Sequence, residues 1–107
     1  MNEIDVTALH TLLAQDPPAR VVDVRETSEF VAGHVPGARS VPLSELVARA
    51  QEIDALAPPV YLVCESGGRS AQAATWLAGQ GHDVVNVTGG TSAWRRAGLP
   101  VEHAHTH

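Results

Sequence analysis

The segment VYLVCESGGRSAQAA, residues 60–74, contains the only cysteine of the chain, Cys64. The apolar run before this cysteine is rich in residues that favour strands, and it predicts a short buried strand. From Arg69 or Ser70 to about Ala78 the residues are strong helix formers, and small alanines on one face would let the helix lie close to a sheet. A strand, a glycine-containing loop and a helix in this order predict an α/β unit with Cys64 at the carboxyl end of the strand.

The rest of the chain repeats this alternation of strands and helices. Two more short, mostly β-branched runs, residues 20–24 and 84–87, predict further buried strands. Helices are expected in four other places. The first runs from a cap at Asp5 or Thr7 to Leu13, and a short second one follows Thr27 or Ser28 with Phe30 and Val31 facing inward. A third runs from Pro42 to Leu56 with an apolar stripe of Leu46, Val47, Ala50 and Ile53, and a last short one contains Trp94. The pattern predicts a single α/β domain over residues 1–107, with a mainly parallel sheet and helices on both faces.

The composition argues against several classes of protein. Apolar residues make up 44% of the chain and charged residues 18%, which is enough apolar surface for one core and too little charge for disorder. The formal charge of -5 argues against nucleic acid or an anionic membrane as a partner. No apolar stretch has the length of a membrane span, and the first residues lack the pattern of a signal peptide. Because a lone cysteine cannot form an internal disulfide, we expect a cytoplasmic protein whose thiol stays reduced.

The last residues, 103–107, are polar and carry histidines at alternate positions. Such histidines could bind a metal weakly, but no cysteine or carboxylate cluster joins them at ligand spacing. We therefore expect a disordered tail here, and neither a metal site nor a cofactor in the domain.

The loop after Cys64 has the residues that a reactive thiol requires. Gly67 and Gly68 tolerate unusual φ values, so that successive N–H groups can curl inward. A helix that starts near Ser70 directs its N-terminal amides and its dipole at the same point, and Arg69 adds a positive charge. These groups would lower the pKa of the thiol from about 8.5 and so favour the thiolate. The alternative is a small buried filler residue, but the glycines, the arginine and the strand–loop–helix context favour the reactive thiol.

Three motifs resemble those of the single-domain rhodanese family of sulfurtransferases. Cys64-Glu65-Ser66-Gly67-Gly68-Arg69-Ser70 is similar to the active-site loop of that family, Cys-x-x-Gly-x-Arg-Ser. Residues 22–26, 29–30 and 33–38 resemble its N-terminal signature, and Gly89-Gly90-x-x-x-Trp94 with Gly98-Leu99-Pro100-Val101 resembles its C-terminal one. The likeness spans about residues 3–102, and it implies a three-layer domain with a mainly parallel central sheet of about five strands.

The resemblance also implies a reaction. The Cys64 thiolate would attack the outer sulfur of thiosulfate or of a persulfide, hold that sulfur as a persulfide, and pass it to a thiol, or to cyanide in assays. The rest of the loop would bind the substrate and ring the sulfur with donors: Glu65, Ser66, Gly67, Gly68, Arg69 and Ser70. The expected partners are a small sulfur donor and a thiol acceptor, with a redox or sulfur-relay protein as a candidate.

Two alternatives to this enzyme have to be weighed. Cys-dependent phosphatases, some of which share this fold, use Cys-x5-Arg, whereas Cys64 and Arg69 form Cys-x4-Arg. The shorter interval makes a smaller ring, which suits one sulfur atom better than a phosphoryl group. The other alternative is a non-catalytic sulfur carrier, or a sensor or binding module. Cys64 argues against a binding module, since inactive relatives typically lack the cysteine, but carriage and free catalysis need the same loop.

Four other residues are candidates for a supporting role. Asp23 ends a buried strand, so its carboxylate either accepts hydrogen bonds from the active loop or finds a partner on the neighbouring turn. Arg25 is expected to pair with Glu29, with contact to a bound anion as the alternative. His34 is expected to stabilise its turn rather than to act as a catalytic base. Glu65 either weakens the use of anionic thiosulfate or turns to solvent with little effect.

Overall fold

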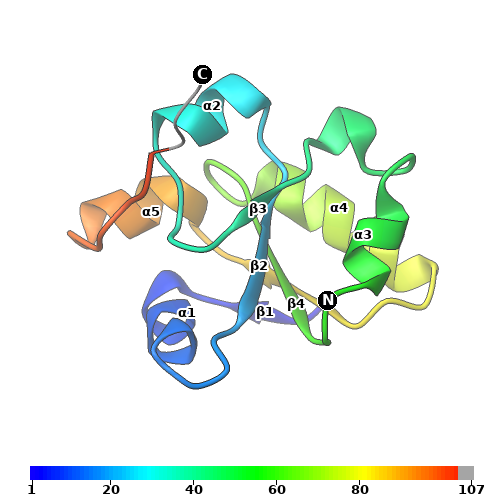
Figure 1. The fold of residues 1–107 in the computed structure, drawn as a ribbon, viewed down its shortest axis with the longest axis horizontal. Coiled ribbons are helices and arrows are strands. Elements are labelled where there is room, and N and C mark those ends of the chain that lie inside the picture. The colour runs from blue at the N-terminus through cyan, green and yellow to red at the C-terminus, as the bar shows by residue number, and fades with distance from the viewer. Residues whose placement is uncertain (104–107) are drawn as a thin grey trace.

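A sheet of five parallel strands forms the middle of the computed structural model, which describes residues 1–103 (Figure 1). In chain order the strands are β1 (Glu3–Ile4), β2 (Arg20–Asp23), β3 (Arg39–Ser40), β4 (Val60–Val63) and β5 (Val84–Val87). Their order across the sheet is β1-β5-β4-β2-β3, and each neighbouring pair is parallel. The predicted α/β fold with a mainly parallel sheet of about five strands is therefore confirmed.

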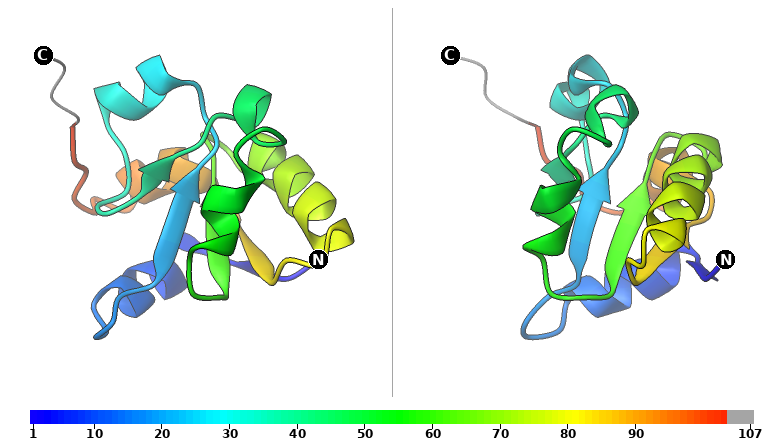
Figure 2. Two further views of the ribbon diagram at one scale, coloured as in Figure 1. Left: turned by 45° about the vertical axis from the view of Figure 1, so that its right-hand side comes forward. Right: turned by 90° about the vertical axis from the view of Figure 1, so that its right-hand side faces the viewer.

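Helices cover both faces of this sheet. They are α1 (Val6–Leu13), α2 (Thr27–Ala32), α3 (Ala50–Asp54), α4 (Gly68–Gly79) and α5 (Gly90–Arg96), with a 3-10 turn, η1, at Leu43–Glu45. In Figure 1, α1 and α5 lie on one side of the strands and α3 and α4 on the other, and Figure 2 shows the second side turned toward the viewer. Because successive residues of a strand point to opposite faces, β2, β4 and β5 each supply apolar residues to both layers.

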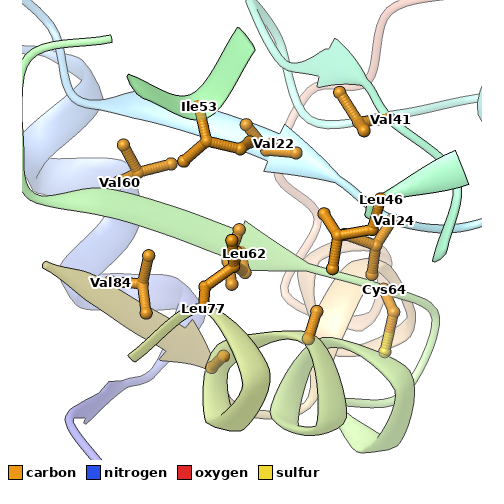
Figure 3. Packing of buried hydrophobic residues seen from close by; sticks show 12 residues of the cluster. Val22, Val24, Val41, Leu46, Ile53, Val60, Leu62, Cys64, Leu77 and Val84 are labelled. Atoms are coloured by element: carbon orange, nitrogen blue, oxygen red, sulfur yellow. The ribbon is translucent and has the colours of Figure 1, made fainter. Parts of the chain in front are cut away.

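The core accordingly consists of two apolar clusters, one on each face. The first packs strand residues such as Val22 and Leu62 against Leu77 of α4 (Figure 3). The second packs Val21 and other strand residues against α1 and the fully buried Trp94 of α5. Cys64 belongs to the first cluster, at the end where β4 passes into the loop before α4.

The ends of the predicted helices agree with the structure in most places. Of the two candidate caps of α1, Asp5 is the one used, since its carboxylate accepts the Ala8 N–H at 2.8 Å. In α2, Phe30 and Val31 are half-buried rather than fully inward, and the Phe30 ring stacks on His34 with centroids 3.7 Å apart. The helix after Cys64 begins at Gly68, one or two residues earlier than expected.

The predicted helix from Pro42 to Leu56 is wrong as a continuous element. The chain forms η1, then turns over residues 46–49, and only then forms α3. Leu46 and Ile53 are buried as expected, but Val47 is 70% exposed. The apolar spacing could not distinguish one helix from two short turns, because both arrangements bury the same two side chains.

The structure contains two strands, β1 and β3, that no local pattern in the sequence predicts. β1 and β3 contain two residues each, too few to show an alternation of apolar and polar positions. None of the helices formed by residues 1–103 is both long and apolar enough to span a membrane. Of the predicted disordered tail, only His103 lies within the described residues, where it is exposed.

Candidate active site

Cys64 lies where the sequence predicts it, directly after β4 and before the first turn of α4. Cys64 is buried, with 1% of its surface exposed. The Gly67 N–H donates to the Cys64 Sγ at 3.1 Å, and the Ser70 hydroxyl lies 3.4 Å from the same sulfur. The sulfur is thus held at the N-terminus of α4 among backbone and hydroxyl donors, rather than among apolar groups alone.

These donors change the acidity of the thiol. Burial of Cys64 raises the pKa, but hydrogen bonds from the Ser70 side chain and from the backbone amides of Ser70, Gly67 and Ser66 outweigh burial, and the pKa falls below its ordinary value. A thiol with a lowered pKa has a larger fraction of thiolate near neutral pH, and the thiolate is the nucleophilic form. The loop therefore has the electrostatic environment of a reactive cysteine.

The loop depends on two glycines that have different functions. Gly67 has a φ of 109°, a conformation that side chains disfavour, at the point where its N–H donates to the sulfur. Gly90 approaches the loop from α5, and a Cβ on it would lie 2.5 Å from the Cys64 carbonyl oxygen. Thr91 holds the same oxygen with its N–H at 2.8 Å and its hydroxyl at 3.0 Å. The first turn of α5 therefore fixes the backbone of the cysteine, a contact that the sequence reasoning missed.

Asp23 has its partner on the neighbouring turn and not in the Cys64 loop. Its carboxylate accepts the backbone N–H of Arg25 at 2.9 Å and pairs with the Arg25 guanidinium at 2.8 Å. Both side chains are buried, with exposures of 0% and 1%. The same guanidinium donates to the Gly33 carbonyl at 2.8 Å and to a Glu65 carboxylate oxygen at 3.1 Å. Burial lowers the pKa of Arg25, but its pairs with Asp23 and Glu65 raise it by more.

The expected pair between Arg25 and Glu29 is wrong, because Glu29 is bound to Arg69. The two side chains form a bidentate pair with N···O distances of 2.7 and 2.9 Å. The hydrogen bond from Arg69 lowers the pKa of Glu29 to about 2. Arg69 was expected to contribute a positive charge near the sulfur, and in the structure this charge is offset by a carboxylate.

The prediction that Glu65 turns to solvent is wrong, because its side chain is paired. Its carboxylate is 37% exposed, and it bridges two arginines: Arg25 at 3.1 Å and Arg95 of α5 at 2.8 Å. The charge beside the nucleophile is therefore neither idle in solvent nor unbalanced. Arg95 was not singled out in the sequence, and no local pattern would have identified it, since its contact depends on how α5 packs on the loop.

Asn86, a polar residue inside the buried strand β5, was also missed in the sequence analysis. It is 2% exposed, and its side chain contacts the Ser70 hydroxyl at 2.6 Å and the Glu3 carboxylate at 3.1 Å. A signal for it did exist. An amide within an otherwise apolar strand needs a hydrogen-bond partner when it is buried, and so indicates a polar contact.

His34 has the structural role expected of it. Its Nδ1 bonds the Phe30 carbonyl at 2.7 Å, and its backbone pairs with that of Glu102. Among residues 1–103, no group of three or more histidine, cysteine, aspartate or glutamate side chains is arranged to hold a metal ion.

Comparisons with known proteins agree with this geometry. Residues 5–97 match the family model of the rhodanese-like domain. The chain is 38% identical over 102 residues to a sulfurtransferase of Allochromatium vinosum, covering 94% of each chain. It is 40% identical over 95 residues to the thiosulfate sulfurtransferase GlpE of Pseudomonas putida, covering 86% of this chain and 83% of that one.

A solved structure gives the same result for the fold. The crystal structure of a rhodanese-like domain protein from Staphylococcus aureus superposes with a TM-score of 0.84 at 30% identity, covering 98% of this chain and all of the other. This chain belongs to the family of rhodanese-like domains, whose members include sulfurtransferases.

Proposed function

We propose that this protein is a sulfurtransferase that moves a sulfane sulfur from thiosulfate or a persulfide to a thiol, or to cyanide, through a persulfide on Cys64. One observation supports this most directly: the buried Cys64 sulfur accepts the Gly67 N–H and lies beside the Ser70 hydroxyl at the N-terminus of α4. Two similar proteins carry sulfurtransferase names.

The reaction consists of two displacements at sulfur. In the first, the Cys64 thiolate forms a bond to the outer sulfur of the donor, and the donor's S–S bond breaks. The leaving group, sulfite or a thiolate, departs with the electron pair. In the second, an acceptor thiolate or cyanide bonds to that outer sulfur, and the Cys64 thiolate leaves. Because sulfite and thiolates leave as stable anions, neither step requires a general acid.

The loop would stabilise the negative charge at each stage. The amides that lower the pKa of Cys64 also favour its thiolate as the leaving group of the second step. In the persulfide the charge lies on the outer sulfur, which neighbouring N–H groups of the same loop would stabilise in the same way.

The experiment is intact-protein mass spectrometry after treatment with thiosulfate, and separately with a small persulfide. We expect a gain of one sulfur atom on Cys64 that a thiol reverses, and none after prior alkylation of the cysteine. If neither donor gives an adduct, the protein is a binding module and the proposal fails. If the adduct forms but passes only to a protein thiol, the protein is a sulfur carrier rather than a free catalyst.

Glu65 bears on the choice of donor. A carboxylate about 6 Å from an incoming anion costs on the order of 1–3 kcal/mol at an effective dielectric near 20, before salt screening. Arg25 and Arg95 offset part of this repulsion, but both are then already bound to Glu65, and thiosulfate would have to compete for them. We infer that the site favours a persulfide with little charge over the thiosulfate dianion.

Replacing Glu65 with Gln tests this preference. The variant should use thiosulfate with a lower KM and a weaker dependence on salt, while its KM for an uncharged persulfide stays the same. Glu102→Gln provides a control, since it removes an exposed carboxylate outside the loop. An unchanged KM and salt dependence for thiosulfate would exclude a role of Glu65 in donor choice.

A further inference from the structure

Beneath the Cys64 loop, a buried chain of polar side chains connects the sulfur to the edge strand of the sheet. Ser70 lies 3.4 Å from the Cys64 Sγ and 2.6 Å from the Asn86 Oδ1, and the Asn86 Nδ2 lies 3.1 Å from the Glu3 Oε2. Ser70 is 0% exposed and Asn86 2%. Because water does not reach Ser70 or Asn86, the protons of these two side chains have to be donated to acceptors within the protein.

The direction of each hydrogen bond follows from the chemistry of the groups. The Glu3 carboxylate can only accept, so the Asn86 amide nitrogen must face it and donate. The amide oxygen therefore faces Ser70, and since an amide oxygen cannot donate, the hydroxyl must donate to it. The Gly67 carbonyl, 3.5 Å from the same amide nitrogen, is also only an acceptor and supports this orientation.

The Ser70 hydroxyl has one proton and three acceptors within reach. These are the Asn86 Oδ1 at 2.6 Å, the Gly67 carbonyl at 3.3 Å and the Cys64 sulfur at 3.4 Å. The shortest contact takes the proton while the sulfur is uncharged. A thiolate is a much better acceptor than a thiol, because hydrogen bonds to a charged partner are about twice as strong as neutral ones.

We propose that Asn86 is a positioning residue that competes with the Cys64 sulfur for the Ser70 proton, holding that proton while the sulfur is neutral and releasing it when the sulfur becomes an anion. In the thiol, the S–H donates to Ser70 and Ser70 donates to Asn86. In the thiolate, the hydroxyl rotates and donates to the sulfur. Once the sulfur carries a second sulfur atom, it is neutral again and the proton returns to Asn86. This last step rests on the proposed function, whereas the first two do not.

The competition gives the effect of Asn86 a definite sign. Turning the Ser70 proton to the thiolate leaves a buried amide oxygen without a donor, which opposes ionisation. Asn86 therefore moderates the stabilisation that Ser70 gives the thiolate. Removing the amide should therefore make Cys64 ionise more readily. A purely structural role of Asn86 predicts the opposite, a looser loop and a less acidic thiol.

The charged groups around the loop have to be separated from this effect. They lie on several elements: Glu65 and Arg69 in or directly after the loop, Asp23 and Arg25 at the end of β2, Glu29 on α2, Arg95 on α5 and Glu3 on β1. Of these, Glu3 is the one that hydrogen-bonds the Asn86 side chain. The other six form ion pairs on the outer side of the loop, which substitutions at Asn86 and Ser70 leave in place.

The test is a pH titration of the thiolate's ultraviolet absorbance, for which the single cysteine gives an unambiguous signal. Asn86→Leu, of similar volume, should move the midpoint to lower pH and raise the ratio of thiolate to thiol below the midpoint by roughly three- to tenfold, the value of about one hydrogen bond. Ser70→Ala should move the midpoint to higher pH. The double variant should titrate like Ser70→Ala, because Asn86 acts through Ser70.

A second variant guards against loss of folding in Asn86→Leu. Glu3→Ala removes the exposed carboxylate that orients the amide, and it should shift the midpoint in the same direction as Asn86→Leu but by less. Asp83→Ala is the matched control, since it removes an exposed carboxylate at the opposite end of β5 and should leave the midpoint unchanged.

The possible outcomes separate this inference from the proposed function. A midpoint that rises or stays constant in both Asn86→Leu and Glu3→Ala overturns the inference, as does a shift that persists when Ser70 is alanine. If Cys64 titrates as described but takes sulfur from no donor, the proposed function fails and the competition stands. If Cys64 takes up sulfur but both Asn86→Leu and Glu3→Ala leave the titration unchanged, the inference fails and the proposed function stands.

Discussion

The two sides of the Cys64 loop differ in the interactions that they contain. On the outer side, Glu29 binds Arg69, and Glu65 bridges Arg25 and Arg95, so that the charges are paired. On the inner side, neutral groups contact the sulfur: the Gly67 N–H and the Ser70 hydroxyl, which in turn contacts Asn86. Full charges remain where water can screen them, with the buried Asp23–Arg25 pair as the exception. The pKa of the Cys64 thiol is therefore lowered by hydrogen bonds from neutral groups, whereas the charged groups of the outer side neutralise one another.

The largest expected effect is the loss of sulfur uptake when the Cys64 sulfur, which lies between the two sides of the loop, is replaced. Cys64→Ser should abolish the uptake of sulfur completely, because a serine hydroxyl is not ionised near neutral pH and forms no persulfide. Its circular dichroism spectrum should match that of the wild type, since serine has nearly the same shape. Residual transfer above the rate without protein would place the chemistry elsewhere.

The next effect concerns the one buried pair of the outer side. Arg25→Met should lower the free energy of unfolding by about 3–5 kcal/mol, measured by chemical denaturation, because it leaves the Asp23 carboxylate buried without its partner. The control Arg39→Met breaks an exposed pair with Glu52 and should cost far less. If the double variant Asp23→Leu/Arg25→Met regains stability, the unpaired buried carboxylate is the cause of the loss. An equal loss in Arg25→Met and Arg39→Met would refute this explanation.

A smaller effect is expected at the exposed end of the Glu65 bridge. Arg95→Gln should lower the free energy of unfolding by no more than about 1 kcal/mol, because surface pairs contribute little. It should raise the KM for thiosulfate by about two- to tenfold at low salt, since Glu65 then loses part of its compensation. Arg96→Gln changes the net charge equally but contacts Ser92 instead of Glu65, and it serves as the control. A KM that rises equally in both variants would show only the effect of net charge.

The smallest effect is the dependence of stability on pH through Glu29. Its pKa in the folded state, about 2, lies below its ordinary value of 4.5, so the pair with Arg69 stabilises the fold at pH values above 4.5. This contribution is lost as the pH falls from 4.5 toward 2, and partial exposure limits it to about 1 kcal/mol or less. Wild type and Glu29→Gln should therefore converge in unfolding free energy at the acidic end of this range. A constant difference between them across the range would contradict this assignment.

The sequence predicts the parts of the fold in which local pattern and local contact coincide. The three long strands, the helix after Cys64 and the glycines of its loop follow from residues close together in the chain. The two-residue strands β1 and β3 do not, because they are defined by pairing rather than by pattern. The division of residues 43–54 into η1 and α3 also could not be predicted, since one helix would bury the same side chains.

The same distinction holds within the candidate site. Cys64, Gly67 and Ser70 are close in sequence and could be predicted together. Thr91 and Arg95 contact the loop because α5 packs on it. The partners of Arg25 and Glu29 were predicted wrongly for a related reason. A spacing of four allows two side chains to pair, but each of these found a partner on another element with better geometry.

The contact of Gly90 and Thr91 with the Cys64 backbone has a practical consequence for protein engineering. The helix that fixes the cysteine comes from the last part of the described chain, and the side chain that orients Asn86 comes from the first strand. A chain divided in the turn between α4 and β5 would therefore carry Cys64 and Glu3 on one fragment and Asn86, Gly90 and Thr91 on the other, so that neither fragment holds the complete environment of the thiol. Its reactivity toward a fluorescent alkylating reagent would then report, in a single optical signal, the reassembly of the two halves.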